Sequence, residues 1–224
     1  EPGVHRGYEY SRTNNPTRQA LQECLASLEV AAYGLAFASG MSAEDTLLRT
    51  LSPGDHIVLG NDAYGGTFRL ISAVLAPMGF AWTATDLTDP DALRAAMRPE
   101  TKIVWAETPT NPLLTVVDIA AIAEIVHEGD ARLVVDNTFA TPYLQQPLSH
   151  GADVVVHSTT KYCGGHSDVV GGFLATNDTE LSDRLAYLQN AIGAVGSPFD
   201  NYLTLRGLKT VSYTHLRAHE TSKH

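Results

Sequence analysis

Cysteine is scarce in this sequence, because Cys24 and Cys163 are the two thiols among 224 residues. Two thiols so far apart do not make a disulfide framework, so we expect both to be reduced and the protein to be cytoplasmic. Long apolar runs are also missing. We find no segment long enough to span a bilayer and no signal peptide at the start. The first residue is Glu1 rather than methionine, so we expect a fragment whose natural start could hold a targeting segment.

Basic residues are few as well. The 15 Lys and Arg against 25 Asp and Glu give a formal net charge of -10, which argues against nucleic acid or an anionic membrane as a partner. Glycine-rich nucleotide fingerprints of the Walker or GxGxxG kind are absent, and so are internal repeats. What the sequence does have is 224 residues that are 44% hydrophobic, enough for one domain with a substantial core.

Segments that resemble buried strands alternate with segments that have a helical apolar period. The expected strands are 56–59, 80–85, 102–107, 133–135, 153–156 and 169–176. The expected helices are 17–29, one that turns Leu47, Leu48 and Leu51 inward, one that turns Phe68, Ile71, Leu75 and Met78 inward, 89–97, one that begins at Asp118, and 179–191. The expected inner face of the first helix is Ala20, Leu21, Cys24, Leu25 and Leu28. Such alternation predicts an α/β fold with a mainly parallel sheet and helices on both faces.

Two polar residues follow neighbouring apolar runs in the segment 133–168. Asp136 closes the run 133–135, and Lys161 follows the run 153–156. In a parallel sheet both would lie at the carboxyl edge, where open α/β folds bind their ligands. A lysine amine there can form a Schiff base with the aldehyde of pyridoxal 5'-phosphate (PLP), while the carboxylate pairs with the protonated ring nitrogen. Taken singly, a strand-end Asp is more often a cap or turn former, and a loop Lys is more often solvated.

Residues with hydroxyl groups or small side chains occur beside the lysine and at the start of a predicted helix. They can supply hydroxyl and amide donors to a phosphate, and a helix start also favours an anion through its dipole. The candidate donors beside the lysine are Ser158, Thr159, Thr160, Gly164 and Gly165, and the helix start is at Ser39 and Gly40. His157 and His166 flank the lysine, but no converging set of further ligands accompanies them, so we predict no metal site.

Several motifs, in the same order, resemble the Cys/Met metabolism family of PLP-dependent enzymes. They are DAYGGTFRLI at 62–71, ETPTNPLL at 107–114, DNTFATPYLQQPL at 136–148 and HSTTKYCGGHSDVVGG at 157–172. The resemblance extends from Tyr10 to Thr210. It implies a type I, aspartate aminotransferase-like large domain with PLP as cofactor, small amino-acid substrates and a homo-oligomer, by analogy a tetramer.

The resemblance also divides the chain into three parts. Residues 1–16 would form an N-terminal arm segment, 17–210 the PLP-binding large domain, and 211–224 a tail outside the family. The tail reads VSYTHLRAHETSKH, which is similar to translated adapter sequence and is expected to lack a helix. The family's C-terminal small domain, which grips the substrate carboxylate, would then be missing from this chain.

By position, the resemblance implies a role for each site residue. Tyr10 and Arg12 would reach across a subunit interface to a neighbour's PLP phosphate, which suits a guanidinium and a hydroxyl donor. Tyr64 would stack on the cofactor and move a proton to or from the substrate, so Lys161 and Tyr64 are the expected catalytic residues. Asn111 would lie near the phenolic oxygen. The expected cofactor-binding residues are Tyr10, Arg12, Ser39, Gly40, Met41, Tyr64, Asn111, Asp136, Thr138, Ser158, Thr160 and Lys161.

Within the family, the quoted segments look closest to bacterial cystathionine γ-synthases, which use cysteine to replace the acyl group of an O-acylhomoserine. We expect O-succinylhomoserine as the substrate. Cystathionine γ-lyases and homoserine sulfhydrylases share most of these motifs and stay open alternatives, as does a PLP-binding fragment without activity. Methionine γ-lyases carry a cysteine where this chain has Gly66, which argues against that reaction. Glu107 could equally face the cofactor or support its loop.

Overall fold

The structure is a computed structural model that describes residues 7–221. Its strands are β1 (Tyr33–Phe37), β2 (His56–Gly60), β3 (Ala81–Thr85), β4 (Thr101–Glu107), β5 (Arg132–Asp136), β6 (Val154–Ser158) and β7 (Gly172–Thr176). Within the described residues these form one seven-stranded sheet with the order β1-β7-β6-β5-β4-β2-β3. The five strands β2, β3, β4, β5 and β6 run parallel, whereas β7 is antiparallel to both of its neighbours. The expected mainly parallel sheet is therefore confirmed.

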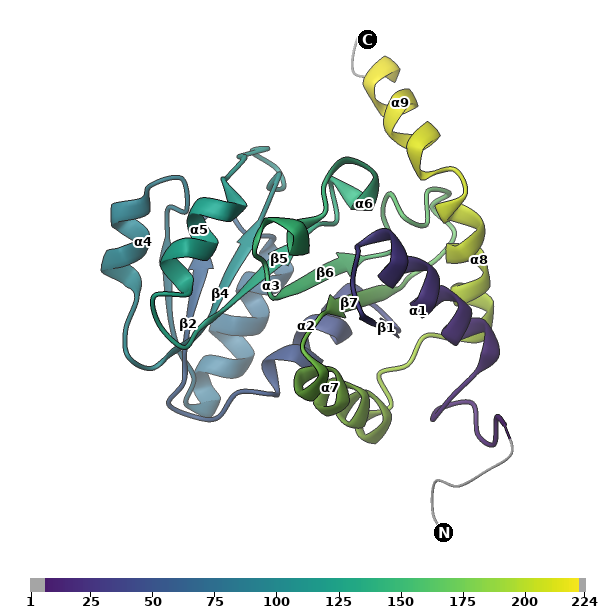
Figure 1. Cartoon of the computed structure of the whole chain (residues 1–224), viewed down its shortest axis with the longest axis horizontal. Coiled ribbons are helices and arrows are strands. Elements are labelled where there is room, and N and C mark those ends of the chain that lie inside the picture. Colours follow the sequence, from purple (N-terminus) through teal and green to yellow (C-terminus); the bar gives the residue numbers. More distant parts are fainter. Residues whose placement is uncertain (1–6, 222–224) are drawn as a thin grey trace.

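The helices cover this sheet from both sides (Figure 1). They are α1 (Pro16–Leu28), α2 (Gly40–Leu48), α3 (Gly65–Arg69), α4 (Pro90–Ala96), α5 (Ile119–Val126), α6 (Thr141–Leu144), α7 (Thr179–Ile192), α8 (Pro198–Leu208) and α9 (Val211–Thr221). A π-helix η1 (Leu70–Leu75) continues α3, and short 3₁₀ helices η2 (Ala76–Met78) and η3 (Pro147–His150) follow later. Among residues 7–221, no helix combines the length and apolar character that crossing a membrane requires.

Polar caps determine where the longer helices begin. Asn15, Ser39, Asp118 and Asp178 each precede a helix, and each side chain accepts a hydrogen bond from a backbone amide of the first turn. Such a cap satisfies an amide that has no partner inside the helix. The helix expected to begin at Asp118 is confirmed, because Asp118 caps α5.

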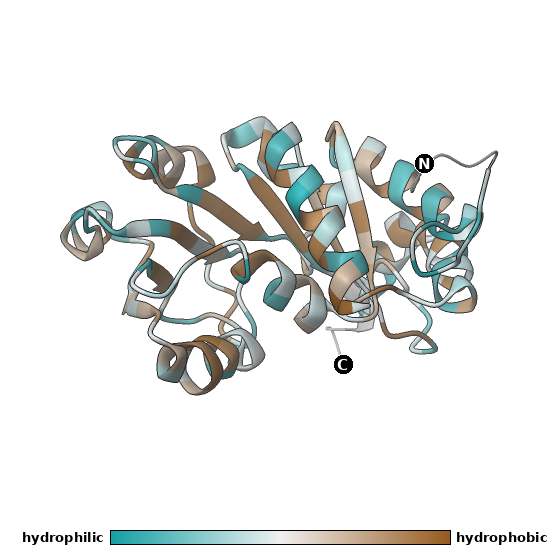
Figure 2. Cartoon of the chain, turned by 90° about the horizontal axis from the view of Figure 1, so that it is seen from below, coloured by the Kyte–Doolittle hydropathy of each residue, from teal (hydrophilic) through white to brown (hydrophobic). Residues whose placement is uncertain are grey.

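The core lies in layers on the two faces of the sheet, because side chains of a strand alternate between them. In β4, Ile103 and Trp105 pack under α2, η1 and α7, whereas Val104 and Ala106 pack under α4 and α5. A third cluster joins α1 and α8 to Val155 of β6. Figure 2 shows brown, apolar stretches in the central strands, and most of the helices around them carry both hydrophobic and hydrophilic residues. With both faces covered, ligand access is left to the edges of the sheet.

The helix after Tyr64 differs from the expected one. Ile71 and Leu75 are buried as predicted, but Phe68 and Met78 are 45% and 55% exposed, so that part of the prediction is wrong. The physical reason is the π-helix η1, whose wider turn breaks the period of 3.6 residues that the prediction assumed. Phe68 instead packs edge-on against Trp82, with ring centroids 5.5 Å apart.

Two other element predictions need correction. In α1, Leu21 and Leu25 are buried, but Ala20 and Leu28 face outward and Cys24 is half-buried, because Arg18 and Ala26 occupy the inner face instead. The strand expected over 169–176 is shorter, since β7 begins at Gly172.

The C-terminal tail is helical up to Thr221, so the expectation that it lacks a helix is wrong. Residues 211–221 form α9, which packs near α6 through a hydrogen bond of 2.9 Å between Thr141 Oγ1 and His215 Nε2. The His215 ring also stacks on Tyr162. Residues 1–6 of the expected arm segment and 222–224 of the tail lie outside the described residues.

Candidate active site

The carboxyl edge of the sheet brings Asp136 and Lys161 to one cavity. Asp136 is the last residue of β5 and pairs in register with Val156 of β6, while Lys161 follows the end of β6 by three residues. Both line a cavity of about 890 Å³, which is large enough for a cofactor with a small substrate. The described residues that line it are Ser39, Gly40, Met41, Glu44, Tyr64, Glu107, Asn111, Asp136, Thr138, Phe139, Ser158, Thr160, Lys161, Tyr162, Gly165, Ser167, Val169, Val170 and Thr214. All the predicted site residues except Tyr10 and Arg12 are among them.

The start of α2 forms one wall of this cavity. Ser39 and Ser42 cap the helix reciprocally, and each side-chain oxygen accepts the other residue's amide at 3.0 Å. The amides of Gly40 and Met41 belong to the first turn of α2, where backbone amides have no hydrogen-bond partner inside the helix. A side chain on Gly40 would meet Ser158, since a Cβ there would lie 3.0 Å from the Ser158 Cβ. Glycine therefore lets the helix start approach β6, so that its amides and the Ser158 hydroxyl can converge on an anion.

Glu107 connects the loops that carry Tyr64 and Asn111. Its Oε2 accepts the Tyr64 amide at 2.6 Å, and its Oε1 accepts the Asn111 amide at 3.0 Å. Glu107 was expected either to face the cofactor or to support its loop. It does support both loops, and it also lines the cavity. Burial and the charge of Asp136 raise the pKa of Glu107 to about 8, although its two amide donors act against the shift.

Gly66 leaves room for the Tyr64 ring. A Cβ at Gly66 would lie 2.3 Å from Tyr64 Cε1 and 2.9 Å from Met41 Sδ, and real side chains do not approach so closely. Tyr64 is 40% exposed where it lines the cavity, so its ring and hydroxyl are accessible. A larger residue at position 66 would have to move that ring.

Asp136 is a buried carboxyl, 7% exposed, whose Oδ1 accepts the Thr138 amide at 2.9 Å. The Thr138 hydroxyl in turn accepts the Ser158 amide at 2.8 Å, which ties the ends of β5 and β6 together. Burial raises the pKa of Asp136, while the Thr138 contacts and the charge of His157 lower it. A ligand cation placed against this carboxyl would favour its charged form.

A buried polar network lies behind these strand ends. His157 Nε2 donates to Glu29 Oε1 at 2.5 Å, and Asn137 Nδ2 donates to the same oxygen at 2.9 Å. Gln145 Nε2 then donates to Asn137 Oδ1 at 2.9 Å and to the Thr108 carbonyl at 3.1 Å. The network joins the residue that ends α1 to the ends of β4, β5 and β6, which holds the carboxyl edge in place.

His157 and Glu29 form a fully buried pair in this network. Burial lowers the pKa of His157, but the adjacent Cys163 sulfur and the Glu29 carboxylate raise it, to about 10 in all. His157 Nε2 therefore faces the Glu29 carboxylate. Among residues 7–221, no three His, Cys, Asp or Glu side chains are grouped in a way that could hold a metal ion.

Tyr10 and Arg12 lie in the arm, away from the cavity of their own chain. Arg12 donates to the backbone carbonyl of Asn190 at 2.5 Å and stacks over the Tyr10 ring at 5.1 Å. Both side chains are exposed. Their role at a neighbour's site stays a prediction about a second copy of the chain.

The cavity also contains residues that were missed by sequence reasoning. Glu44 was missed because an acid in the middle of a helix is typically solvent-exposed, and here it is 3% exposed. Its spacing was the available signal, since it lies one turn after Gly40 on the same helix face. Phe139 follows Asp136 by three residues and Tyr162 directly follows Lys161. The centroids of their two rings lie 5.8 Å apart.

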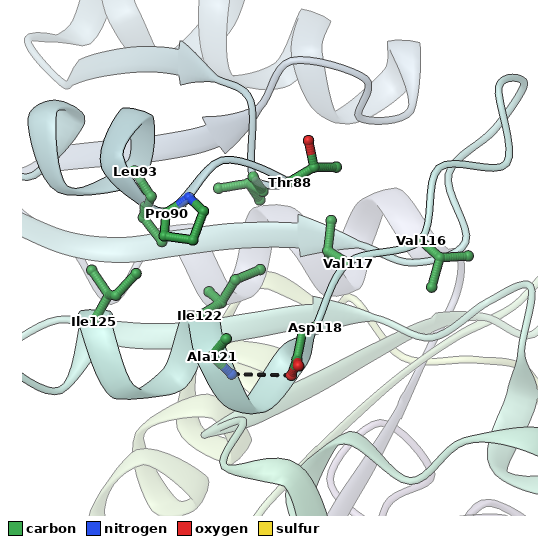
Figure 3. Close-up of a pocket in the computed structure, with 10 residues that line it drawn as sticks. Thr88, Pro90, Leu93, Val116, Val117, Asp118, Ala121, Ile122 and Ile125 are labelled. Atoms are coloured by element: carbon green, nitrogen blue, oxygen red, sulfur yellow. Dashed lines mark hydrogen bonds between the residues drawn. The ribbon is translucent and has the colours of Figure 1, made fainter.

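A second, smaller cavity of about 120 Å³ lies between α4 and α5 (Figure 3). Its lining is mostly aliphatic, with Leu93, Ile122 and Ile125 facing it. Of the described residues that line it, Asp118 is the one acid, and its Oδ1 already accepts the Ala121 amide at 3.1 Å as the cap of α5. The described residues that line this cavity include none of those that line the large one.

The raised pKa values predict how the stability of the PLP-free chain depends on pH. Glu44 and Glu107 have an ordinary pKa of 4.5 that rises to about 8 in the folded chain. Between these values the folded state holds protons that the unfolded state has released. The free energy of unfolding should therefore fall as pH rises, by about 2 kcal/mol or more between pH 6 and pH 8.5. Urea unfolding at both pH values checks this, with Glu44→Gln expected to flatten the slope; stability that is constant or rises with pH would contradict it.

The groups around the large cavity fit PLP. Its phosphate suits the amides of Gly40 and Met41, and its aldehyde suits the Lys161 amine. Its protonated ring nitrogen supplies the cation that the buried carboxyls lack: Asp136 has a raised pKa, and Glu44 Oε2 is buried without a hydrogen-bond partner among the described residues. A neutral ligand would leave these acids uncompensated.

Comparisons with known proteins agree with this fit. The chain is 56% identical over 210 residues to a probable cystathionine γ-synthase of Herpetosiphon aurantiacus, covering 94% of this chain and 66% of that protein. It is 59% identical to the cystathionine γ-synthase of Mycobacterium tuberculosis, covering 93% of this chain and 54% of that protein. The crystal structure of metB from Corynebacterium glutamicum superimposes with a TM-score of 0.92 at 55% identity, covering 95% of this chain and 55% of that one.

Relatives named for other reactions are almost as similar. The chain is 51% identical to a cystathionine β-lyase of Coxiella burnetii, covering 94% of this chain and 55% of that protein. A cystathionine γ-lyase structure from Lactobacillus plantarum, complexed with L-serine, has a TM-score of 0.92 at 50% identity, with 95% of this chain and 56% of that one covered. The chain spans between about half and two thirds of the length of these relatives. The family model for Cys/Met metabolism PLP-dependent enzymes matches residues 1–224, and the chain belongs to that family.

Proposed function

We propose that this chain forms the cofactor-binding part of a cystathionine γ-synthase. The reaction would replace the γ-substituent of an O-acylhomoserine, with O-succinylhomoserine as the favoured substrate, by cysteine to give cystathionine. The observation that carries the proposal is the convergence of Lys161, Asp136 and Tyr64 on one cavity, in a chain more than half identical to proteins named for this reaction.

Each residue of the cavity has a task in this chemistry. PLP, when bound, supplies an electron sink for the negative charge that develops on the substrate's α carbon. The Lys161 amine is the base beside that carbon, and it can return the proton at the next carbon. Asp136 would hold a negative charge against the ring nitrogen, and Asn111 would orient the phenolic oxygen. The Tyr64 hydroxyl reaches the same space and can exchange a proton with the leaving side of the substrate.

Three alternatives follow from the comparisons and from the chain itself. Cystathionine γ-lyase is one alternative, and the similarity to a γ-lyase structure at 50% identity supports it. A homoserine sulfhydrylase would use the same lysine base and the same PLP electron sink, with a sulfur nucleophile other than cysteine. A fragment that binds PLP without turnover is the alternative of another class, since the chain covers about half of the relative from Mycobacterium tuberculosis.

A product assay separates these readings. The chain would be tested alone and fused after Thr210 to the C-terminal half of the Mycobacterium tuberculosis synthase, with PLP and O-succinylhomoserine, with and without cysteine. Cystathionine formed only with cysteine supports the synthase. Cleavage of added cystathionine to cysteine, 2-oxobutanoate and ammonia, without synthesis, supports the γ-lyase and refutes our proposal. If the chain tested alone binds PLP but forms no product, the result supports an inactive PLP-binding fragment for the chain without its C-terminal half.

We also propose that the protein acts as a homotetramer in the cytoplasm. The exposed Tyr10 and Arg12 support an oligomer, because neither side chain lines the cavity of its own chain. The free thiols of Cys24 and Cys163 suit a reducing compartment.

The tail 211–224 gives a further prediction. We propose that it lies outside the cofactor domain, which then comprises residues 17–210 after the arm segment 1–16. Tyr213 and Leu216 of α9 are 58% and 61% exposed, whereas Val211 is buried and Thr214 lines the cavity. A chain that ends at Thr210 should keep its PLP affinity within about twofold, because Thr214 is the one described lining residue of the cavity that is lost. Its thermal midpoint should fall only slightly, because among residues 211–217 Val211 is the one buried side chain. Titration of PLP absorbance and thermal unfolding check this; a large loss of affinity would show that the α9 contacts at Thr141 and Tyr162 matter.

A further inference from the structure

Glu44 is a buried acid to which the proposed mechanism gives no task. It lies on α2, one turn after Gly40, and Gly40 lies against Ser158 of β6. Because residues four apart share a helix face, Glu44 faces the same end of the sheet. It lines the large cavity together with Asp136, which projects from the next strand, β5. Carboxyls from two different elements therefore line the same cavity, and the charge of Asp136 acts on Glu44.

One oxygen of the Glu44 carboxyl is buried without a hydrogen-bond partner among the described residues. Its Oε2 atom is shielded from solvent and makes no hydrogen bond within residues 7–221. The Thr67 hydroxyl lies close enough to influence Glu44 but does not reach hydrogen-bond geometry, and it is unpaired too. Buried polar atoms in native proteins are rarely left in this state. The arrangement points to a ligand group that completes it.

The charge of this pair indicates which group that is. Burial and the charges of Asp136 and Glu107 raise the pKa of Glu44 to about 8, with the Thr67 hydroxyl acting against the shift. Burial also raises the pKa of Asp136, while Thr138 and His157 lower it. Adjacent carboxyls cannot both ionise freely, so they titrate as a pair. A cation against the pair removes this restriction, and a protonated pyridine nitrogen is such a cation.

We propose that Glu44 is a second acid of the subsite for the cofactor's ring nitrogen, and that it releases its proton when the cationic ring binds beside Asp136. The inference rests on the proposed use of PLP and adds a residue to that site. Without cofactor, Glu44 is neutral when protonated, so its charge does not add to that of Asp136 in the cavity. With cofactor, ionised Glu44 adds its charge to that of Asp136 and so helps to keep the ring nitrogen protonated.

The test is the number of protons exchanged when PLP binds to the whole chain. Calorimetric titrations at pH 8 in buffers of different ionisation enthalpy measure it for the unmodified chain and for Glu44→Gln. Near its pKa Glu44 is half protonated, so the unmodified chain should release about half a proton more per PLP, or take up that much less, than Glu44→Gln. The comparison is made where the absorption spectra of bound PLP show equal protonation of the ring nitrogen in the two proteins, so that the difference reports Glu44 alone. Equal proton exchange in the two proteins would overturn the inference.

Matched variants separate a titrating role from a structural one. Asp45→Asn makes the same charge change one residue along α2, where Asp45 pairs with Arg49 near the surface, and should behave like the unmodified chain. Glu44→Asp keeps an acid and should restore the proton release. If Glu44→Gln does not fold, infrared spectra of Glu107→Gln at pH 8 should show a protonated carboxyl band that disappears when PLP is added; its absence would overturn the inference.

The outcome is independent of the product assay. PLP binding with the expected proton difference but without cystathionine synthesis would refute the synthase alone. Cystathionine synthesis without that difference would refute the role of Glu44 alone.

Discussion

Replacing Lys161 with alanine is expected to lower turnover of the fusion protein by about 10⁴-fold or more, because the variant loses both the covalent attachment of PLP and the base at the substrate's α carbon. Lys161 lines the cavity that Asp136 also faces, so no other described lysine is placed to substitute for it. Rates of cystathionine formation measure the loss. Mass spectrometry after borohydride treatment should find PLP attached to the peptide that contains Lys161 in the unmodified protein and not in the variant.

Two controls make this result specific. Lys161→Arg keeps the positive charge but cannot be attached in the same way, so it should be as inactive as Lys161→Ala. Lys209→Ala is the same substitution at an exposed lysine outside the cavity and should leave turnover unchanged. Turnover by Lys161→Ala close to that of the unmodified protein would show that another group is the base, and the proposed mechanism would be wrong.

Replacing Asp136 with asparagine should lower turnover by about 10²–10³-fold, the usual cost of removing one preorganised electrostatic contact from an active site. The amide has nearly the same shape, and its oxygen can still accept the Thr138 amide that Asp136 Oδ1 accepts at 2.9 Å. What is lost is the negative charge that holds the proton on the ring nitrogen. Rates of cystathionine formation and the absorption spectrum of bound PLP as a function of pH measure the two effects together.

The charge argument has its own controls. Asp136→Glu keeps the charge and should recover part of the activity, whereas Asp45→Asn removes a charge from the surface of α2 and should have no effect on turnover. A variant Asp136→Asn that keeps full turnover and an unchanged spectrum would mean that the ring nitrogen does not depend on this carboxyl.

The carboxyl edge was predictable because its signal is local. Asp136 and Lys161 each follow an apolar run, and the geometry of parallel strands then brings them to one edge. The positions of Gly40 and Ser158 followed from a helix start and a strand end in the same way. The structure places all of these on one cavity.

Other features depend on contacts that no local pattern contains. Phe68 and Met78 were expected inside because a regular helical period was assumed, and the π-helix η1 interrupts it. Glu44 looked like a solvent-exposed helix residue, and its burial follows from the approach of α2 to β6. Tyr10 and Arg12 have no partner cavity in their own chain, so neither sequence pattern nor a single copy can test their role.

The network behind the strand ends bears on the order in which the chain folds. Glu29 is the acceptor for His157, which lies 128 residues later, and for Asn137, 108 residues later. During synthesis, Glu29 is made long before His157, so it has no partner from this network's strand β6 while about the first 150 residues are being translated. Closing so long a loop is slow and costs chain entropy, so α1 should dock firmly only after β6 has joined the sheet. Active-site assembly and the docking of the N-terminal helix would then be a single late event, in which the chain first acquires the ability to hold its cofactor.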